Sequence, residues 1–121
     1  MKRATIALFL LLAACRESKP AAQSNAALGD AARGKELIVS NGCTVCHAVP
    51  GIRGPQGAIG PTLDGIARRP TLSRANVPNS PETLVRFIEN PASVNPNSTM
   101  PALGLPPGQA NDIAAYLMTL D

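Results

Sequence analysis

The sequence predicts an all-α domain with long loops, and three observations lead to this prediction. Three segments between residues 29 and 121 carry helix caps or helical apolar spacing. The stretches between them are rich in Gly and Pro, of which the 121-residue chain has 10 and 12. No stretch alternates apolar and polar residues with the Val, Ile or aromatic content of a strand. We therefore expect helices joined by large loops and no sheet.

Each predicted helix has its own start and stop signals. The first is expected from Asp30 to Gly42 and the second from Ser80 to Asn90, where Asn90–Pro91 ends it. Asp30 and Ser80 have side chains that cap helix N-termini. The third is expected from about Gly108 to Leu120. Its buried face follows from apolar residues at the spacing i, i+3, i+4 and i+7, which are Ile113, Tyr116, Leu117 and Leu120.

The first 28 residues have the pattern of a targeting signal followed by a tether. Residues 1–14 combine a basic start, an apolar run of eleven residues and a small-residue end, which is typical of an export signal. Eleven apolar residues are too few for a membrane-spanning helix, which needs about 20. Residues 15–28 are small and polar without apolar periodicity, so we expect a flexible tether. The folded domain is expected over residues 29–121.

Cys15 follows Leu12-Ala13-Ala14, and this sequence resembles the lipobox of bacterial lipoproteins. In a lipobox the Cys becomes the first mature residue and carries a diacylglycerol on its sulfur. Because two or three acyl chains anchor a protein firmly, this interpretation predicts a membrane anchor at Cys15. The alternative is an ordinary signal peptide that leaves Cys15 as a free thiol. We favour lipidation.

The charge of the chain does not indicate a nucleic-acid partner. The whole chain has 11 Lys or Arg and 8 Asp or Glu. Without residues 1–14 the basic residues number nine, so the apparent basicity belongs mostly to the signal. Arg68, Arg69 and Arg74 form the main basic concentration, which is typical of a solvated face, with a docking patch as the alternative. We therefore expect no nucleic-acid partner.

Cys43-Thr44-Val45-Cys46-His47 is the C-x-x-C-H motif of c-type haem attachment. Two thiols three residues apart on one turn can reach the two vinyl groups at a haem edge, while the adjacent imidazole can bind the iron. We expect one haem c, bonded to Cys43 and Cys46, with His47 as an axial iron ligand. A haem would also fill a domain whose only aromatic residues are Phe87 and Tyr116.

Other uses of Cys43 and Cys46 fit the sequence less well. A structural zinc site needs four ligands, yet His47 is the only histidine and the third cysteine, Cys15, lies beside the signal. A thioredoxin-like pair expects a βαβ setting, and the sequence predicts no strands. A disulfide across two intervening residues is strained and rare. Haem attachment is therefore the preferred interpretation.

The loop after the motif contains glycine at every third residue over a short run. This spacing is far too brief for a repeat structure. It indicates a flexible loop, because glycine leaves the backbone unrestricted. The glycines are Gly51, Gly54, Gly57 and Gly60.

The sixth iron position decides what such a haem does. A Met opposite the His raises the reduction potential and suits electron transfer, whereas an open position binds gases or peroxide. Apart from Met1 in the signal, the chain has two methionines. Met118 is expected to point away from the buried face of the last helix, about 140° round from Ile113. Met100 precedes Pro101, which favours an extended backbone, and we expect Met100 to bind the iron.

Residues 29–121 resemble the class I c-type cytochromes over nearly their whole length. The residues that carry the resemblance are Gly29 to Lys35 before the C-x-x-C-H motif, Gly60 to Leu63, Asn95–Pro96 with Thr99–Met100–Pro101, and Asp112 to Leu117. The resemblance implies the cytochrome c fold, with three main helices and long Gly/Pro-rich loops around one haem. It also implies that the Pro61 carbonyl accepts the other ring N–H of His47. Gly34 and Tyr116 match positions where the first and last helices cross.

Two features depart from this family. Lysines are scarce, so the basic ring that many soluble relatives use for docking is not evident. The aromatic residues that usually bind the haem propionates are missing, and Arg53 or Arg69 is the candidate substitute. Residues 69–121 also resemble cytochrome domains associated with bacterial respiratory oxidases.

The sequence therefore predicts an electron carrier and not an enzyme. We expect a monomer on the periplasmic side, anchored to a membrane through Cys15. Its partners would be redox proteins, a reductase and a terminal oxidase or other oxidoreductase of a respiratory chain. One alternative is a haem subunit of a larger oxidoreductase. Another is a gas-sensing or peroxidase-like haem protein, although no distal acid-base residue is apparent.

Overall fold

The computed structural model describes residues 29–121. The expected signal, tether and lipidated Cys15 lie outside the described residues. In chain order the elements are α1 (Ala31–Ser40), the 3₁₀ turns η2 (Cys43–Val45) and η3 (Ile66–Arg68), β1 (Thr71–Leu72), β2 (Val77–Pro78), α2 (Pro81–Glu89), α3 (Pro91–Val94) and α4 (Gln109–Leu117). The described part of the chain is thus helical with long loops, as the sequence predicts.

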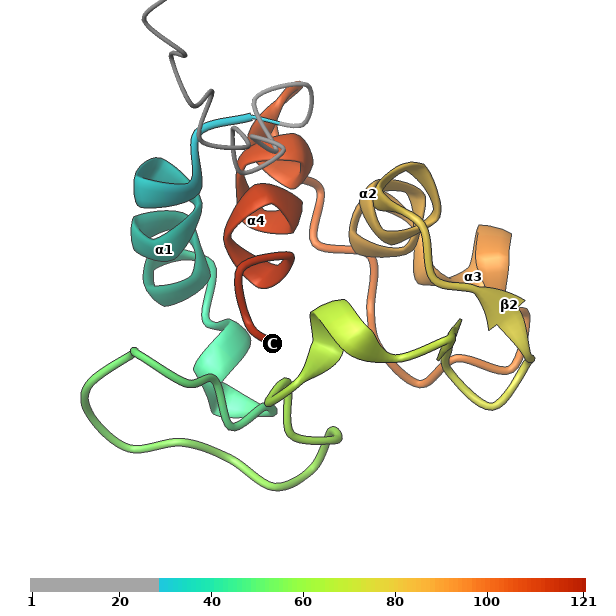
Figure 1. Cartoon of the computed structure of the whole chain (residues 1–121), viewed down its shortest axis with the longest axis horizontal. Coiled ribbons are helices and arrows are strands. Elements are labelled where there is room, and N and C mark those ends of the chain that lie inside the picture. Colours follow the sequence, from blue (N-terminus) through green and yellow to red (C-terminus); the bar gives the residue numbers. More distant parts are fainter. Residues whose placement is uncertain (1–28) are drawn as a thin grey trace, which may run out of the picture.

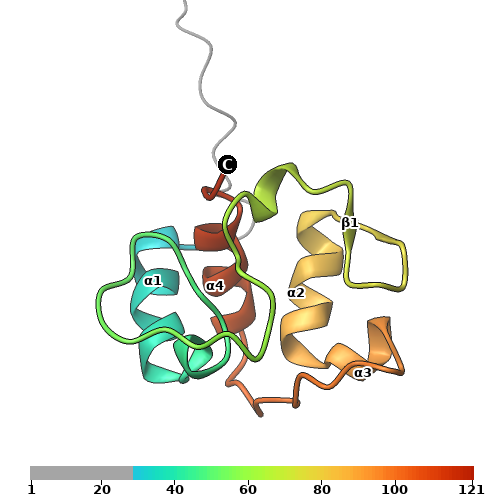
Figure 2. The same ribbon diagram turned by 90° about the horizontal axis from the view of Figure 1, so that it is seen from below.

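Helices α1 and α4 lie side by side, and α2 stands on the other side of α4 (Figures 1 and 2). The α1–α4 crossing is close at Gly34, where a Cβ would overlap the backbone carbonyl of Asp112. The Asp112 carboxylate accepts a hydrogen bond from the Asp30 N–H at 2.9 Å. It also lies 3.3 Å from the Arg33 guanidinium. Asp112 therefore fastens the start of α1 onto α4.

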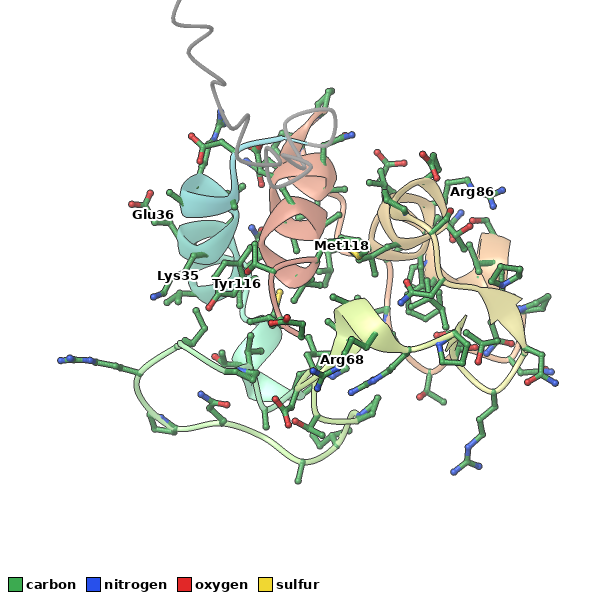
Figure 3. The ribbon with its side chains drawn as sticks, in the orientation of Figure 1. Lys35, Glu36, Arg68, Arg86, Tyr116 and Met118 are labelled. Atoms are coloured by element: carbon green, nitrogen blue, oxygen red, sulfur yellow. The ribbon has the colours of Figure 1, made fainter. Side chains whose placement is uncertain are left out.

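Tyr116 fastens α4 to α1 and to the loop that follows the C-x-x-C-H motif. The Lys35 ammonium of α1 lies 6.0 Å from the centroid of its ring, and Figure 3 shows the two side chains together. The Tyr116 hydroxyl donates to the carbonyl of Pro50 at 2.7 Å. Burial raises the pKa of this phenol. Gly51 packs so closely that a Cβ would overlap the hydroxyl.

The predicted caps are present at the starts of α1 and α2. The Asp30 carboxylate accepts from the backbone N–H groups of Ala32 and Arg33. The Ser80 hydroxyl accepts from the N–H of Thr83 at 3.1 Å. These contacts satisfy N–H groups that have no partner inside a helix, which is why each helix begins there.

The helix ends differ from the prediction. Helix α1 ends at Ser40, because the following Asn41 turns out of the helix and its side chain donates to the Leu37 carbonyl at 2.9 Å. Helix α4 ends at Leu117, three residues before Leu120. The short helix α3 follows directly after α2, since Asn90 ends one helix and begins the next.

The structure also corrects the prediction that the chain has no strands. Thr71 pairs with Pro78 and Leu72 with Val77 in an antiparallel hairpin. Strands of two residues are too short for an alternating pattern to appear in the sequence. The hairpin lies beside α2 and α3 (Figures 1 and 2).

The apolar core lies between α1, α2 and α4. Ile38 is 1% exposed, Leu84 2% and Ile113 2%. The other large apolar side chains buried there are Val49, Ile52, Ile66, Leu72, Ile88 and Leu117. Within residues 29–121, the helices are all too short or too polar to cross a bilayer.

Candidate haem site

The motif residues lie on a tight turn after α1. Gly42 has a φ of 70°, a left-handed conformation that glycine adopts readily, and it leads into η2. The N–H groups of Cys46 and His47 both donate to the Cys43 carbonyl, at 3.3 Å and 3.0 Å. Both cysteines are free and partly buried. Burial raises the pKa of the Cys43 thiol, and the neighbouring Cys46 adds to the effect.

The His47 ring has one nitrogen already engaged. Its Nδ1 lies 2.7 Å from the carbonyl oxygen of Pro61. Since a carbonyl oxygen only accepts, the proton of a neutral ring must be on Nδ1. Nε2 then keeps its lone pair, which is the form of imidazole that binds a metal. The contact that the family resemblance implies between His47 and Pro61 is therefore present.

The structure corrects the interpretation of the glycine-rich loop as flexible. The N–H of Gly60 donates to the Cys46 carbonyl at 2.8 Å. A Cβ on Gly60 would overlap the His47 ring, and one on Gly57 would overlap the carbonyl of Val45. These glycines are needed because the backbone passes directly over the attachment turn. The sequence signal for this role is glycine next to Pro61, whereas the regular glycine spacing indicates only flexibility.

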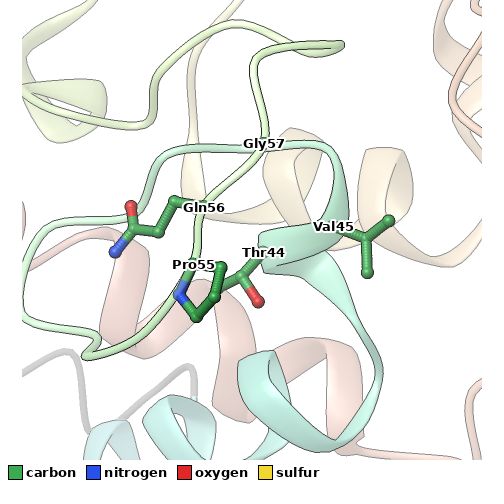
Figure 4. Close-up of a pocket in the computed structure, with 5 residues that line it drawn as sticks. All are labelled: Thr44, Val45, Pro55, Gln56 and Gly57. Carbon is green, nitrogen blue, oxygen red and sulfur yellow. The ribbon is translucent and has the colours of Figure 1, made fainter.

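Gln56 closes the same loop on itself, and the sequence gives no signal for this role. Its side-chain oxygen accepts from the N–H of Val49 at 2.6 Å. Its NH₂ group donates to the carbonyls of Val49 at 3.1 Å and Ile52 at 2.7 Å. An open hollow of about 310 Å³ beside it, shown in Figure 4, is lined by Thr44, Val45, Pro55, Gln56 and Gly57. No thiol, imidazole or ionisable group lines this hollow, so we assign it no chemistry.

Arg69 supports the loop that carries Pro61. Its Nη2 donates to the carbonyls of Thr62 at 2.6 Å and Asp64 at 2.7 Å. This terminal nitrogen therefore holds the backbone next to Pro61. Arg53, the other candidate for binding a propionate, is exposed and has no hydrogen bond or ion pair with another part of residues 29–121.

Asn79 is a partly buried polar residue that the sequence does not distinguish from an ordinary turn residue. Its NH₂ group donates to the carbonyls of Ile66 at 2.8 Å and Arg69 at 2.9 Å, which fixes the orientation of the amide. Its Oδ1 is buried and has no partner within residues 29–121. A buried unpaired acceptor costs about 1–3 kcal/mol. A bound group or water that offers an O–H would satisfy it, and a protonated haem propionate is such a group.

The described residues fit a covalently held haem. The attachment turn offers two thiols and an imidazole nitrogen, and apolar side chains next to the core remain only partly buried. These side chains are Leu37, Leu63, Val85, Phe87, Leu105 and Leu120. Within residues 29–121, His, Cys, Asp and Glu do not gather in threes, so the four ligands of a structural zinc site are not assembled.

The two methionines lie apart from the attachment turn in sequence. Met100 is partly buried on the segment 95–108, which joins α3 to α4, and its N–H donates to the Ser98 hydroxyl at 3.2 Å. Met118 does not point away from the core as predicted. It is partly buried against the core and lies between α4 and α2 in Figure 3. The prediction was wrong because α4 lies between α1 and α2 (Figures 1 and 2), so it is covered on more than the face that carries Ile113.

Comparison with known proteins agrees with this geometry. The family model "Cytochrome c" matches residues 31–121. Cytochrome c2 from Rhodopila globiformis is 34% identical over 104 residues, which cover 76% of this chain and 94% of that protein. Ferric cytochrome c-550 from Paracoccus versutus has a TM-score of 0.57 at 23% identity, covering 76% of this chain and 98% of that one. Cytochrome c2 from Rhodobacter sphaeroides has a TM-score of 0.53 at 21% identity, covering 76% and 96%.

The fold and the attachment turn define a class I c-type cytochrome with one covalently bound haem c. The chain belongs to the cytochrome c family. Cys43 and Cys46 fit its C-x-x-C-H motif. It is an electron-transfer protein that works with redox partners, and not an enzyme. The predicted fold class is confirmed.

Proposed function

We propose that this protein carries single electrons with His47 and Met100 as the two axial ligands of its haem iron. Cys43 and Cys46 hold the haem by thioether bonds. When bound, the haem supplies an iron that alternates between the ferrous and ferric states. The observation that carries the proposal is the contact of 2.7 Å between His47 Nδ1 and the Pro61 carbonyl. It directs the other ring nitrogen to a metal.

The residues around His47 hold the imidazole in one orientation. The Pro61 carbonyl fixes the position of the ring proton and the orientation of the ring. Gly60 packs so closely against the ring that a side chain would not fit. Arg69 holds the backbone immediately after Pro61 through the Thr62 carbonyl. A ligand held this firmly moves little when the iron changes oxidation state, and small rearrangement favours fast electron transfer.

The test is a visible spectrum with haem stoichiometry on the purified mature protein and two variants. We expect one haem per chain and a low-spin ferric spectrum with the sulfur-to-iron charge-transfer band. Met100→Ala is expected to lose this band because the thioether is removed. Met118→Leu is the matched control and is expected to keep it. A high-spin ferric spectrum of the wild type would count against the proposal.

Carbon monoxide separates a closed electron carrier from a gas-sensing or peroxidase-like haem protein. A bound Met100 occupies the position that carbon monoxide needs. We therefore expect the reduced wild type to resist the gas at neutral pH and Met100→Ala to bind it. Ready binding by the wild type would favour the sensor or peroxidase function.

We also place the carrier on the periplasmic side of a membrane, in a respiratory chain, anchored through Cys15. The pattern of residues 1–15 supports this location. Cys15→Ser is expected to move the holoprotein from the membrane fraction to the soluble periplasmic fraction with its spectrum unchanged. If the variant stays in the membrane fraction, another contact holds it there.

The redox partners are proposed to be a reductase and a terminal oxidase or other oxidoreductase. Residues 29–121 contain seven basic and seven acidic side chains, so we expect docking to depend only weakly on salt. Solubilising membranes in mild detergent separates a free carrier from a subunit of a larger oxidoreductase. A carrier elutes at the size of one chain, whereas a subunit elutes with fixed amounts of other proteins.

A further inference from the structure

The segment that carries Met100 makes few hydrogen bonds to the rest of the described structure, although Leu105 packs against the core. It joins α3 to α4, and Figure 1 shows it passing beneath α2. Its internal hydrogen bonds are local, such as Ser98 N–H to the Asn95 carbonyl at 2.9 Å. Within residues 29–121, one hydrogen bond joins residues 95–107 to a distant part of the chain. In this bond the Asn95 side-chain NH₂ donates to the Ser73 hydroxyl at 3.0 Å.

Ser73 is in an unusual backbone conformation at the turn of the β1–β2 hairpin. Its φ is 55°, a left-handed value that a residue with a Cβ adopts at a cost. Its hydroxyl accepts two hydrogen bonds, one from the N–H of Ala75 at 3.2 Å and one from Asn95. Such strain persists where neighbouring contacts hold it, and it often marks a residue with a specific role.

Asn95 uses both ends of its side-chain amide. The NH₂ group reaches Ser73, while Oδ1 accepts from the N–H of Asn97 at 3.1 Å. This second contact forms a turn directly before Met100. The backbone N–H of Asn95 donates to the Pro91 carbonyl at 2.9 Å, which joins the turn to α3. A continuous set of contacts thus runs from the hairpin to the Met100 segment.

We propose that Asn95 and Ser73 form a clamp that positions Met100 for binding to the haem iron. This inference rests on the proposed function, because it assumes that Met100 is the ligand. In this proposal Asn95 and Ser73 act through the segment that they hold, and not by binding the iron themselves. When the clamp is lost, the bond between Met100 and the iron is expected to dissociate more often. The sixth position then becomes available to other ligands.

The test measures imidazole binding to the ferric holoprotein in Ser73→Ala, Asn95→Ala and the double variant. Each single change is expected to raise imidazole affinity by about 3- to 10-fold, the net worth of one hydrogen bond. The double variant is expected to match the larger single effect, since both changes remove the same bond. The sulfur-to-iron band is expected to weaken in all three. Effects that simply add, or an unchanged affinity, would overturn the clamp.

Two controls separate the clamp from general weakening and from failure of the proposed function. Ser93→Ala removes a hydroxyl on the adjacent α3, where it donates to the Asn90 carbonyl at 2.7 Å, and is expected to leave imidazole affinity unchanged. In a Met100→Ala background, Ser73→Ala is expected to have no effect on imidazole affinity. If Met100→Ala itself leaves the sulfur-to-iron band intact, the proposed function fails. If the band is lost there but clamp variants behave as wild type, only the clamp fails.

Discussion

The loop on the His47 side and the segment on the Met100 side are held in different ways. Residues 48–69 make hydrogen bonds to the attachment turn and among themselves through Gly57, Gly60, Leu63, Gln56 and Arg69. Residues 95–107 make one hydrogen bond to a distant part of the described chain, from Asn95, and Leu105 packs against the core. The His47 side is therefore held by the protein's own hydrogen bonds, whereas in the proposed function the Met100 side depends more on a bond from Met100 to iron. We expect Met100 to dissociate before the His47 side opens.

Among the changes that test this comparison, Gly60→Ala is expected to cause the largest loss of stability. A Cβ at this position overlaps the His47 ring. The ring cannot move without losing its hydrogen bond to the Pro61 carbonyl. The free energy of unfolding of the holoprotein is expected to fall by about 3 kcal/mol, measured by urea unfolding. Gly104→Ala is the control on the Met100 segment. Nothing lies within 4 Å of its added Cβ, so only its φ of 61° opposes the change, at about 1 kcal/mol. Equal losses would contradict the difference between the two sides.

Much of the site follows from residues that act over short distances along the chain. The caps at Asp30 and Ser80 and the turn of Cys43 to His47 depend on neighbours in sequence, so their patterns are visible there. The role of Pro61 follows only from the family resemblance, because nothing local connects a proline carbonyl with an imidazole fourteen residues earlier.

The contacts that sequence reasoning missed are long-range or involve backbone atoms. Gln56 and Asn79 bind backbone carbonyls, which every residue possesses, so no partner residue reveals the contact. Gly60 was interpreted as a source of flexibility, although the structure uses its small size. Ser73 and Asn95 are 22 residues apart and meet only because the hairpin and α3 pack together.

Gln56→Leu tests the His47 side and is expected to cause an intermediate loss of stability. The change keeps a similar side-chain volume. It removes the hydrogen bonds that Gln56 makes with the N–H of Val49 and with the carbonyls of Val49 and Ile52. Unfolding free energy is expected to fall by about 2 kcal/mol, with the sulfur-to-iron band unchanged. Asn95→Ala is expected to show the opposite combination, a small loss of stability with a weaker band. If Gln56→Leu weakened the band as much, the two sides would not be independent.

Hydrogen exchange of the wild-type holoprotein tests the comparison without any substitution. Regions held by fewer contacts open at lower free energy than the core. The amides of Ser98 and Met100 are therefore expected to exchange faster than those of Gly60 and Leu63. The opening free energies are expected to differ by about 1 kcal/mol or more. Equal protection measured by NMR would mean that the bond to iron holds the Met100 segment as firmly as the loop.

A change at Glu82 is expected to have the smallest effect on stability, because Glu82 lies outside both loops, in the first turn of α2. Its carboxylate is fully exposed, and a backbone N–H of its own turn together with the Ser80 hydroxyl holds its pKa below the usual value. Since the folded pKa is lower than the unfolded one, the stabilisation is present above the unfolded pKa and is lost as pH falls through the folded pKa.

Glu82→Gln is therefore expected to be slightly less stable than the wild type at pH 7, and this difference should disappear as the pH falls through the lowered pKa of Glu82 in the folded protein. Urea unfolding of both proteins at pH 7 and pH 3 measures it, with the sulfur-to-iron band recorded at each pH. A difference in stability that is the same at both values would contradict the lowered pKa. A weaker band at pH 7 in Glu82→Gln would show that α2 also positions Met100, and the Met100 side would then have a second support besides Asn95.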